Sequence, residues 1–120
     1  MKTSELTGAA LDWAVAKCEG IDYMKDDVRF RGAYARKYST DWAQGGPIIE
    51  RERIAMTPTP DGLWAAYASK GTRLVQHGGQ AVEVFNWTYK QQGETPLIAA
   101  MRCYVISKLG DEVELPEELK

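Results

Sequence analysis

The run Ser39-Thr40-Asp41-Trp42-Ala43-Gln44-Gly45-Gly46-Pro47 holds the densest set of groups in the chain that could bind a ligand. Asp41 and Gln44 supply a carboxylate and an amide, and the ring of Trp42 offers a stacking surface. Gly45 and Gly46 allow a ligand or another backbone to approach closely. We interpret residues 39–47 as a loop, and these five residues as a candidate ligand-binding surface.

Each of these residues also has a purely structural interpretation. Asp41 could accept hydrogen bonds from nearby backbone N–H groups as an Asx turn, which we favour over ligand binding. Trp42 is more often a buried plug at a corner than a stacking platform. Gly45-Gly46 before a helix starting at Pro47 could hold an anion, but the spacing fits neither G-x-x-x-x-G-K-[ST] nor G-x-G-x-x-G.

Arg102 is the sixth candidate residue, on the flank of a predicted apolar helix face. An arginine in that position usually extends to solvent or pairs with an acid, and less often clamps an anion. We include it as a candidate partner of the residues in the 39–47 loop.

Residues suited to catalysis or metal binding are sparse. His77 is the single histidine and lies in a glycine-rich stretch, where we expect an exposed loop residue rather than a ligand or base. Cys18 and Cys103 fall in separate predicted helices without C-x-x-C spacing, which indicates small, reduced core residues. We therefore predict no catalytic set, no metal site and no cofactor, and do not favour an enzyme.

Charge and hydropathy exclude further classes of protein. The net charge is -2, and residues 111–120 carry five acids and one base, a local charge of -4 that leaves +2 elsewhere. Direct nucleic-acid binding is therefore disfavoured. No apolar run approaches the ~18 residues of a membrane span, so we expect a cytoplasmic protein that does not enter the membrane.

Two segments carry clear helix signals. Residues 7–19 place Leu11, Ala14, Val15 and Cys18 in one stripe, with Asp12 and Glu19 on the opposite face and Gly20 as the stop. Residues 96–109 are bounded by Thr95 as N-cap, Pro96 at the first position and Gly110 after the end.

The strand signals are shorter. Alternation predicts strands over 28–31 and 81–89, and we expect the second to be central or covered on both faces. Residues 54–57 and 63–67 flank the Pro-Thr-Pro-Asp-Gly turn as a hairpin. We interpret 47–53 as a helix with a strand as the alternative, 69–79 as a mobile glycine-dotted stretch, and 90–94 as a turn.

These elements predict one α+β domain over residues 1–120, with two long helices packed on a small antiparallel sheet. The acidic segment 111–120 follows the second helix, and Val113, Leu115 and Pro116 would anchor it.

Three segments resemble the NinX-like family of small phage and prophage proteins, whose function is unknown. They are Leu11-Asp12-Trp13-Ala14-Val15-Ala16, then Tyr38-Ser39-Thr40-Asp41-Trp42-Ala43-Gln44-Gly45-Gly46-Pro47-Ile48-Ile49-Glu50, and Thr95-Pro96-Leu97-Ile98-Ala99-Ala100-Met101-Arg102-Cys103-Tyr104 with Gly110-Asp111-Glu112-Val113. The resemblance spans most of the chain, except residues 68–88. It implies a phage accessory protein acting in the host-cell cytoplasm, and it brings no catalytic residue.

Two hypotheses for function follow. The first is a non-enzymatic module that binds a small or nucleotide-like ligand through residues 39–47, with Arg102 as a further contact. The second is a protein–protein adaptor acting on host or phage recombination or regulatory machinery, for which the acidic tail would serve as a contact. The partner is thus an unknown small ligand or a host or phage protein, and self-association is left open.

Overall fold

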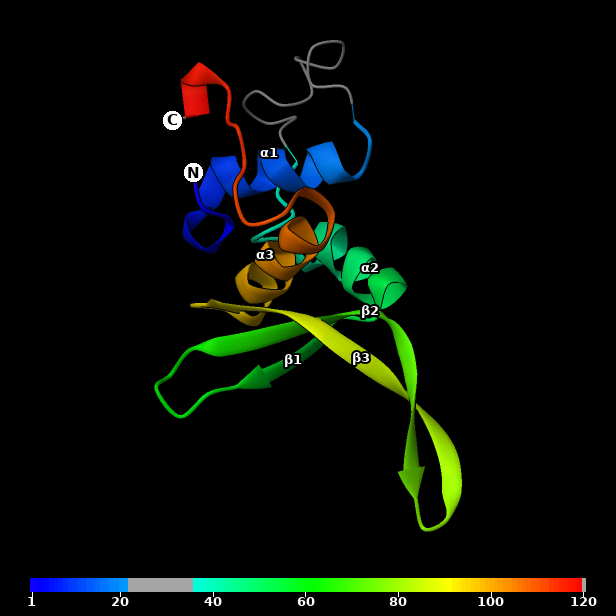
Figure 1. Ribbon diagram of the computed structural model, residues 1–120. Coiled ribbons are helices and arrows are strands. Elements are labelled where there is room, and N and C mark those ends of the chain that lie inside the picture. Colours follow the sequence, from blue (N-terminus) through cyan, green and yellow to red (C-terminus); the bar gives the residue numbers. More distant parts are fainter. Residues whose placement is uncertain (22–35, 120) are drawn as a thin grey trace.

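The computed structural model describes residues 1–21 and 36–119, so the strand predicted over 28–31 lies outside the described residues. The elements, in order, are η1 (Thr3–Glu5), α1 (Gly8–Cys18), α2 (Trp42–Glu52), β1 (Ala55–Pro58), β2 (Trp64–His77), β3 (Gln80–Gly93), α3 (Pro96–Leu109) and η4 (Glu117–Leu119). The three α-helices lie on one side of a three-stranded antiparallel sheet (Figure 1). The α+β prediction is confirmed, with three helices in the described chain in place of two long ones.

α3 is the centre of the molecule. One side packs on the sheet, and α1 and α2 pack mainly against α3 rather than on the strands. Its predicted ends are confirmed: Thr95 Oγ1 accepts a hydrogen bond from the backbone N–H of Ile98 at 3.1 Å, Pro96 opens the helix, and Gly110 follows it at φ 86°.

The burial of α3 is wider than the single apolar arc expected from its sequence. The buried residues come from almost all sides of the helix: Leu97, Ala99, Ala100, Met101, Cys103, Tyr104 and Val105. A helix that is buried all round belongs in the middle of a fold, and the alanines let neighbouring elements approach closely. This explains why two helices can pack on α3 from above while the sheet covers it from below.

The expectation that residues 39–47 form a loop is wrong. α2 already begins at Trp42, so Gly45, Gly46 and Pro47 lie inside a helix. Asp41 caps it, and Pro47, the sixth residue of the helix, lacks the N–H that would otherwise donate to the carbonyl oxygen of Ala43. The helix predicted over 47–53 is confirmed up to Glu52, and the strand alternative is excluded.

The sheet begins with the predicted hairpin. β1 pairs with β2 from Ala55↔Tyr67 to Pro58↔Trp64. In the turn between them, the carboxylate of Asp61 accepts a hydrogen bond from the backbone N–H of Leu63 at 3.0 Å. This is the expected Pro- and Asp-Gly-rich turn, and it fixes the register of the inner sheet.

β2 and β3 extend well beyond the core. Residues 69–79, expected to be an irregular mobile stretch, continue β2 to His77, and Gly78-Gly79 form the two-residue turn with φ of 60° and 83°. β3 likewise continues to Gly93, through the turn expected at 90–94. We call residues 69–87 the arm; it projects away from the helices as a two-stranded ribbon (Figure 1).

The arm also overturns the prediction that the 81–89 strand is central or covered on both faces. The strand order is β1-β2-β3, so β3 is an edge strand. β1 pairs with β2 only as far as Tyr67, so the arm has two exposed edges and no third strand among the described residues.

Candidate functional site

Asp41 and Gln44 form hydrogen bonds at the N-terminal end of α2. Asp41 Oδ1 accepts a hydrogen bond from the backbone N–H of Ala43 at 2.9 Å, and Oδ2 accepts one from Gln44 Nε2 at 3.0 Å. Gln44 Oε1 accepts a further bond from the backbone N–H of Lys37 at 2.9 Å. Both side chains therefore point into the chain around their own helix start, which is the Asx-type role that the sequence favoured for Asp41.

The two glycines have different surroundings. A Cβ on Gly45 would lie 2.4 Å from the carbonyl oxygen of Tyr38 and 2.7 Å from Leu97 Cδ1, whereas on Gly46 its nearest neighbour would be Trp42 at 3.9 Å. Gly45 is buried, and it lets the first turns of α2 rest directly on α3 and on the chain before it. Its backbone is thus occupied by protein contacts.

Trp42 is not the buried plug that we favoured. Its side chain is 52% exposed, because α2 turns Gly45 and Ile48 toward α3 and leaves the ring outside. The segment before it is instead anchored by Ser39, whose backbone N–H donates to Asp12 Oδ1 at 2.8 Å. Burial raises the pKa of Asp12, while the bonds from Ser39 oppose that shift.

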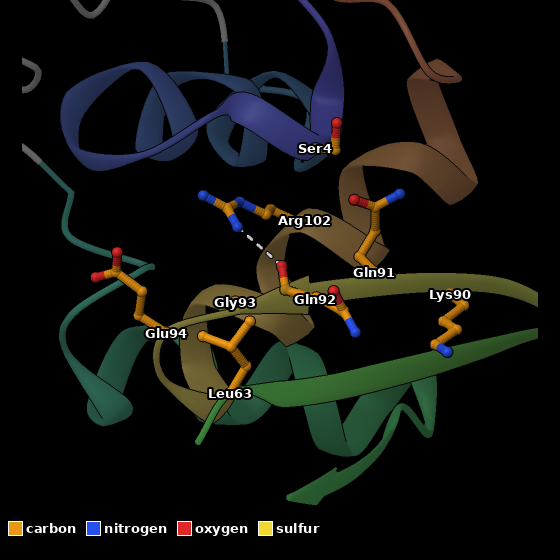
Figure 2. Close-up of a pocket in the computed structure, with 8 residues that line it drawn as sticks. All are labelled: Ser4, Leu63, Lys90, Gln91, Gln92, Gly93, Glu94 and Arg102. Carbon is orange, nitrogen blue, oxygen red and sulfur yellow. Dashed lines mark hydrogen bonds between the residues drawn. The ribbon is translucent and has the colours of Figure 1, made fainter. Parts of the chain in front are cut away.

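Arg102 lies at a separate place, in the groove between η1 and β3. Its Nε donates to the carbonyl oxygen of Leu6 at 2.7 Å. Its Nη1 donates to the carbonyl oxygen of Gln92 at 2.8 Å, as Figure 2 shows. A cavity of about 630 Å³ adjoins it, lined by Ser4, Leu63, Lys90, Gln91, Gln92, Gly93, Glu94 and Arg102. None of Asp41, Trp42, Gln44, Gly45 and Gly46 lines this cavity, so the structure does not join Arg102 to the other five candidates.

The arm holds the surface that the sequence did not reveal. By strand alternation and register, Leu74, Phe85 and Trp87 share one face, and Val75, Val82 and Val84 share the other. Leu74 is 71% exposed, Trp87 46% and Val82 39%. No element among the described residues covers this ribbon, so the large side chains on its two faces form an unusual exposed apolar surface.

The ring pair of the arm lies next to the end of α2. The pairing of β2 with β3 shifts between Ala68 and Ser69 and again between Ser69 and Thr72, so the alternation that places Tyr89 against the core is interrupted before Trp87. The rings of Phe85 and Trp87 lie 5.1 Å apart, and the guanidinium of Arg53 sits 5.6 Å from the Phe85 ring. Phe85 and Trp87 therefore form an aromatic pair of their own beside the end of α2.

Arg53 marks the base of the arm. It ends α2 at φ 54°, a left-handed conformation that costs a non-glycine residue energy. A shallow cavity of about 380 Å³ lies there, between Ile49, Arg53, Ile54 and Phe85. Phe85 belongs both to this cavity and to the ring pair with Trp87, so the exposed ring of Trp87 stands close to the cavity.

A polar network around the buried Tyr104 ties the three helices together. Tyr104 donates its hydroxyl hydrogen to Glu19 at 2.5 Å, and Arg51 binds Glu19 with both terminal nitrogens at 3.1 and 2.7 Å. The hydrogen bonds from Arg51 lower the pKa of Glu19, and burial together with Glu19 raises the pKa of Tyr104. Glu19 was expected on the solvated face of the first helix; in fact this face is bound by α2 and α3.

Cys18, Cys103 and His77 are the remaining residues of a reactive type. Burial raises the pKa of Cys18 and of Cys103 to about 12, so both thiols stay protonated as small core residues. His77 is exposed at the end of β2. In residues 1–21 and 36–119, no group of three or more His, Cys, Asp or Glu could hold a metal ion, and no helix there could cross a membrane.

Comparison with known proteins adds one match. The family model described as "Bacteriophage P22, NinX" matches residues 2–108, which includes α1, α2, the whole sheet and nearly all of α3. No curated protein matches the chain at a significant level.

Proposed function

The chain belongs to the bacteriophage P22 NinX family, and we propose that it is a non-enzymatic adaptor that binds a host or phage protein through its arm. The single observation that carries this proposal is the pair of apolar faces on residues 69–87, which no element in the described part of the chain covers. The proposal places the protein in the host-cell cytoplasm, acting on recombination or regulatory machinery.

The arm has the composition of an interface core. Aromatic residues are enriched at binding hot spots, and Trp87 is the residue type most often found there. A two-stranded ribbon is only marginally stable alone in water, so a partner that covers the ribbon would stabilise it. Binding would bury the apolar side chains of the arm, which favours association, and it would also stabilise the ribbon.

Charges around the arm indicate the kind of partner. The arm carries Lys70 and Arg73, and Arg53 lies over the Phe85 ring at its base, while the single acid of the arm, Glu83, accepts a hydrogen bond from Thr72 at 2.5 Å. A complementary partner would present an apolar groove with an acidic rim, because opposite potentials across an interface favour association. Complex formation should accordingly weaken as salt increases.

The test is affinity purification from phage-infected cells with arm variants. Leu74→Ser with Trp87→Ser should abolish recovery of a partner that the unchanged protein retains, and Gln76→Ser with Asn86→Ser is the matched control on the same ribbon. Each partner is then titrated as a purified protein. Equal recovery by all three proteins would refute the role of the arm.

The same variants address self-association. Sedimentation velocity of the pure protein would reveal a dimer if a second copy covers the arm, and the Leu74→Ser, Trp87→Ser pair should return it to the monomer. A monomer at all concentrations would leave a different protein as the partner.

A second candidate function rests on Trp42. Its ring is 52% exposed beside Gly46, on the surface that we first considered for a small or nucleotide-like ligand. If this surface binds a ligand, nucleotides should raise the melting temperature of the unchanged protein, and Trp42→Ala should remove the rise. No rise with any nucleotide would exclude this function.

A further inference from the structure

We propose that the cavity at Arg102 is a binding site for a small organic molecule that carries a carboxylate or a phosphate group. The site is distinct from the arm and from Trp42, and it uses a guanidinium whose charge the described protein leaves uncompensated (Figure 2).

The first step is the fixed position of the guanidinium. Arg102 is held between two backbone carbonyl oxygens, that of Leu6 at 2.7 Å and that of Gln92 at 2.8 Å. These two bonds join η1 to β3 and prevent the side chain from turning away. An arginine held in this way loses little further conformational entropy when it binds an anion.

The second step is the set of donors that remain. A guanidinium has five N–H donors, and Arg102 uses two of them in the described chain. The remaining three include hydrogens on both terminal nitrogens, which form the planar fork that matches a carboxylate or a phosphate. Carbonyl oxygens satisfy hydrogen bonds but carry no charge to neutralise the arginine.

The third step is the lack of a counter-ion. Across residues 1–21 and 36–119, no carboxylate lies within ion-pair distance of Arg102. Burial lowers its pKa, and the field of Glu94 opposes that shift. A half-buried cation without a paired acid is costly, and an anionic ligand would remove the cost.

Glu94 is the acid that could have compensated the charge, but its place is set by α3. It directly precedes the N-cap Thr95, where the positive end of the helix dipole favours a carboxylate. Glu94 and Lys90 stand toward opposite ends of the cavity, with Arg102 between them (Figure 2). The lining charges, one acid and two bases, sum to +1.

The size and lining of the cavity indicate the class of ligand. A volume of about 630 Å³ lies within the range of small-molecule sites and is far larger than a phosphate ion requires. Ser4 and Gln91 flank Arg102 with polar side chains that hydrogen bond to no described residue, and Leu63 adds an apolar wall. The anionic group would bind the fork, and the organic part would fill the remaining space.

The experiment is an NMR titration of the full chain labelled with ¹⁵N, observing the Arg102 Nε–H signal and the amides of residues 90–94. Inorganic phosphate and acetate are added separately, against sodium chloride at equal ionic strength. Saturable shifts confined to these signals are expected. Saturation by phosphate alone identifies phosphate as the group recognised, and saturation by acetate alone identifies a carboxylate.

Three variants sharpen the result. Glu94→Gln removes the opposing charge and should tighten binding about twofold to fivefold at low salt. Arg102→Lys keeps the charge but loses the fork and should weaken binding about tenfold. Arg36→Gln, at an exposed arginine that does not line this cavity, is the matched control and should leave the anion affinity unchanged.

Two outcomes would overturn the site: no saturable shift with either anion in both the unchanged protein and Glu94→Gln, or unchanged affinity in folded Arg102→Lys. Because Arg102 also joins η1 to β3, the Glu94→Gln variant keeps the test decisive if Arg102→Lys does not fold. Neither outcome bears on the arm, whose function is tested by its own variants.

Discussion

Gly45 and Gly46 are adjacent in α2, yet alanine at the two positions should change stability in opposite directions. In a helix interior, alanine is favoured over glycine by about 1 kcal/mol. At Gly46 the new Cβ would make only an ordinary contact with Trp42 at 3.9 Å, so Gly46→Ala should raise the free energy of unfolding by about 0.5–1 kcal/mol. At Gly45 the same gain meets a steric conflict.

The conflict at Gly45 is with backbone. The carbonyl oxygen of Tyr38 would lie 2.4 Å from the Cβ and Leu97 Cδ1 2.7 Å from it, and both residues are buried. Overpacking of this kind costs typically about 1–3 kcal/mol, and a fixed carbonyl oxygen puts this case at the upper end. After the helix gain is subtracted, Gly45→Ala should lower the free energy of unfolding by about 2 kcal/mol.

The assay is urea unfolding followed by far-UV circular dichroism, with thermal unfolding alongside. A loss of about 2 kcal/mol corresponds to a fall of roughly 5–12 °C in the melting temperature of a domain of this size, and Gly46→Ala should melt a few degrees above the unchanged protein. If both variants shift in the same direction, or Gly45→Ala stays within about 0.5 kcal/mol of the unchanged protein, the close packing of α2 described above is wrong.

Two further predictions concern the network between the helices. Tyr104→Phe removes the hydroxyl that donates to Glu19 and accepts from Arg51. It should lower the free energy of unfolding in urea by about 1–3 kcal/mol, because it leaves a charged acceptor short of a donor. A loss below about 0.5 kcal/mol would contradict the network. The pKa of Glu19 is lowered in the folded protein, so its contribution to stability is complete above its ordinary value of 4.5 and disappears as the pH falls through the folded value. Glu19→Gln should therefore flatten the fall in urea midpoint below pH 4.5, and an unchanged slope would refute the assignment.

The parts of the fold that follow local rules could be predicted from the sequence. Thr95, Pro96 and Gly110 define α3 through capping chemistry that depends on a few neighbouring residues. The first helix and the Asp-Gly turn were likewise predictable, as was the anchoring of the tail by Val113 and Leu115, both of which are buried.

The start of α2 was missed because two local signals conflict. Gly45-Gly46-Pro47 is typical of a helix break, while Asp41 and Gln44 have the spacing of a helix cap and its third residue. The conflict is resolved by tertiary packing, since Gly45 is selected by the carbonyl of Tyr38 and by α3 rather than by a turn. Neither contact is visible in the local sequence.

The arm was missed for a different reason. Alternation in residues 81–89 shows which side chains share a face, but it cannot show whether anything covers that face. Large apolar residues on both sides suggested a covered strand, and the structure has them on a ribbon that none of the described elements covers. Arg102 shows the same limit, because its carbonyl partners at Leu6 and Gln92 come from distant parts of the chain.

The length of the β2–β3 hairpin also affects the order in which this protein folds. Hairpin pairing commonly spreads from the turn. Here the turn at Gly78-Gly79 lies farthest from the buried core, and the stabilising pair Trp64↔Gly93 closes a loop of the 28 residues 65–92. Closing a loop of that length costs about 0.9 kcal/mol more than closing one of about 10 residues, which is roughly a fivefold difference in rate. The arm would therefore complete its pairing after its base has docked on α3, and the surface that we assign to partner binding would be the last part of the sheet to become protected from hydrogen exchange.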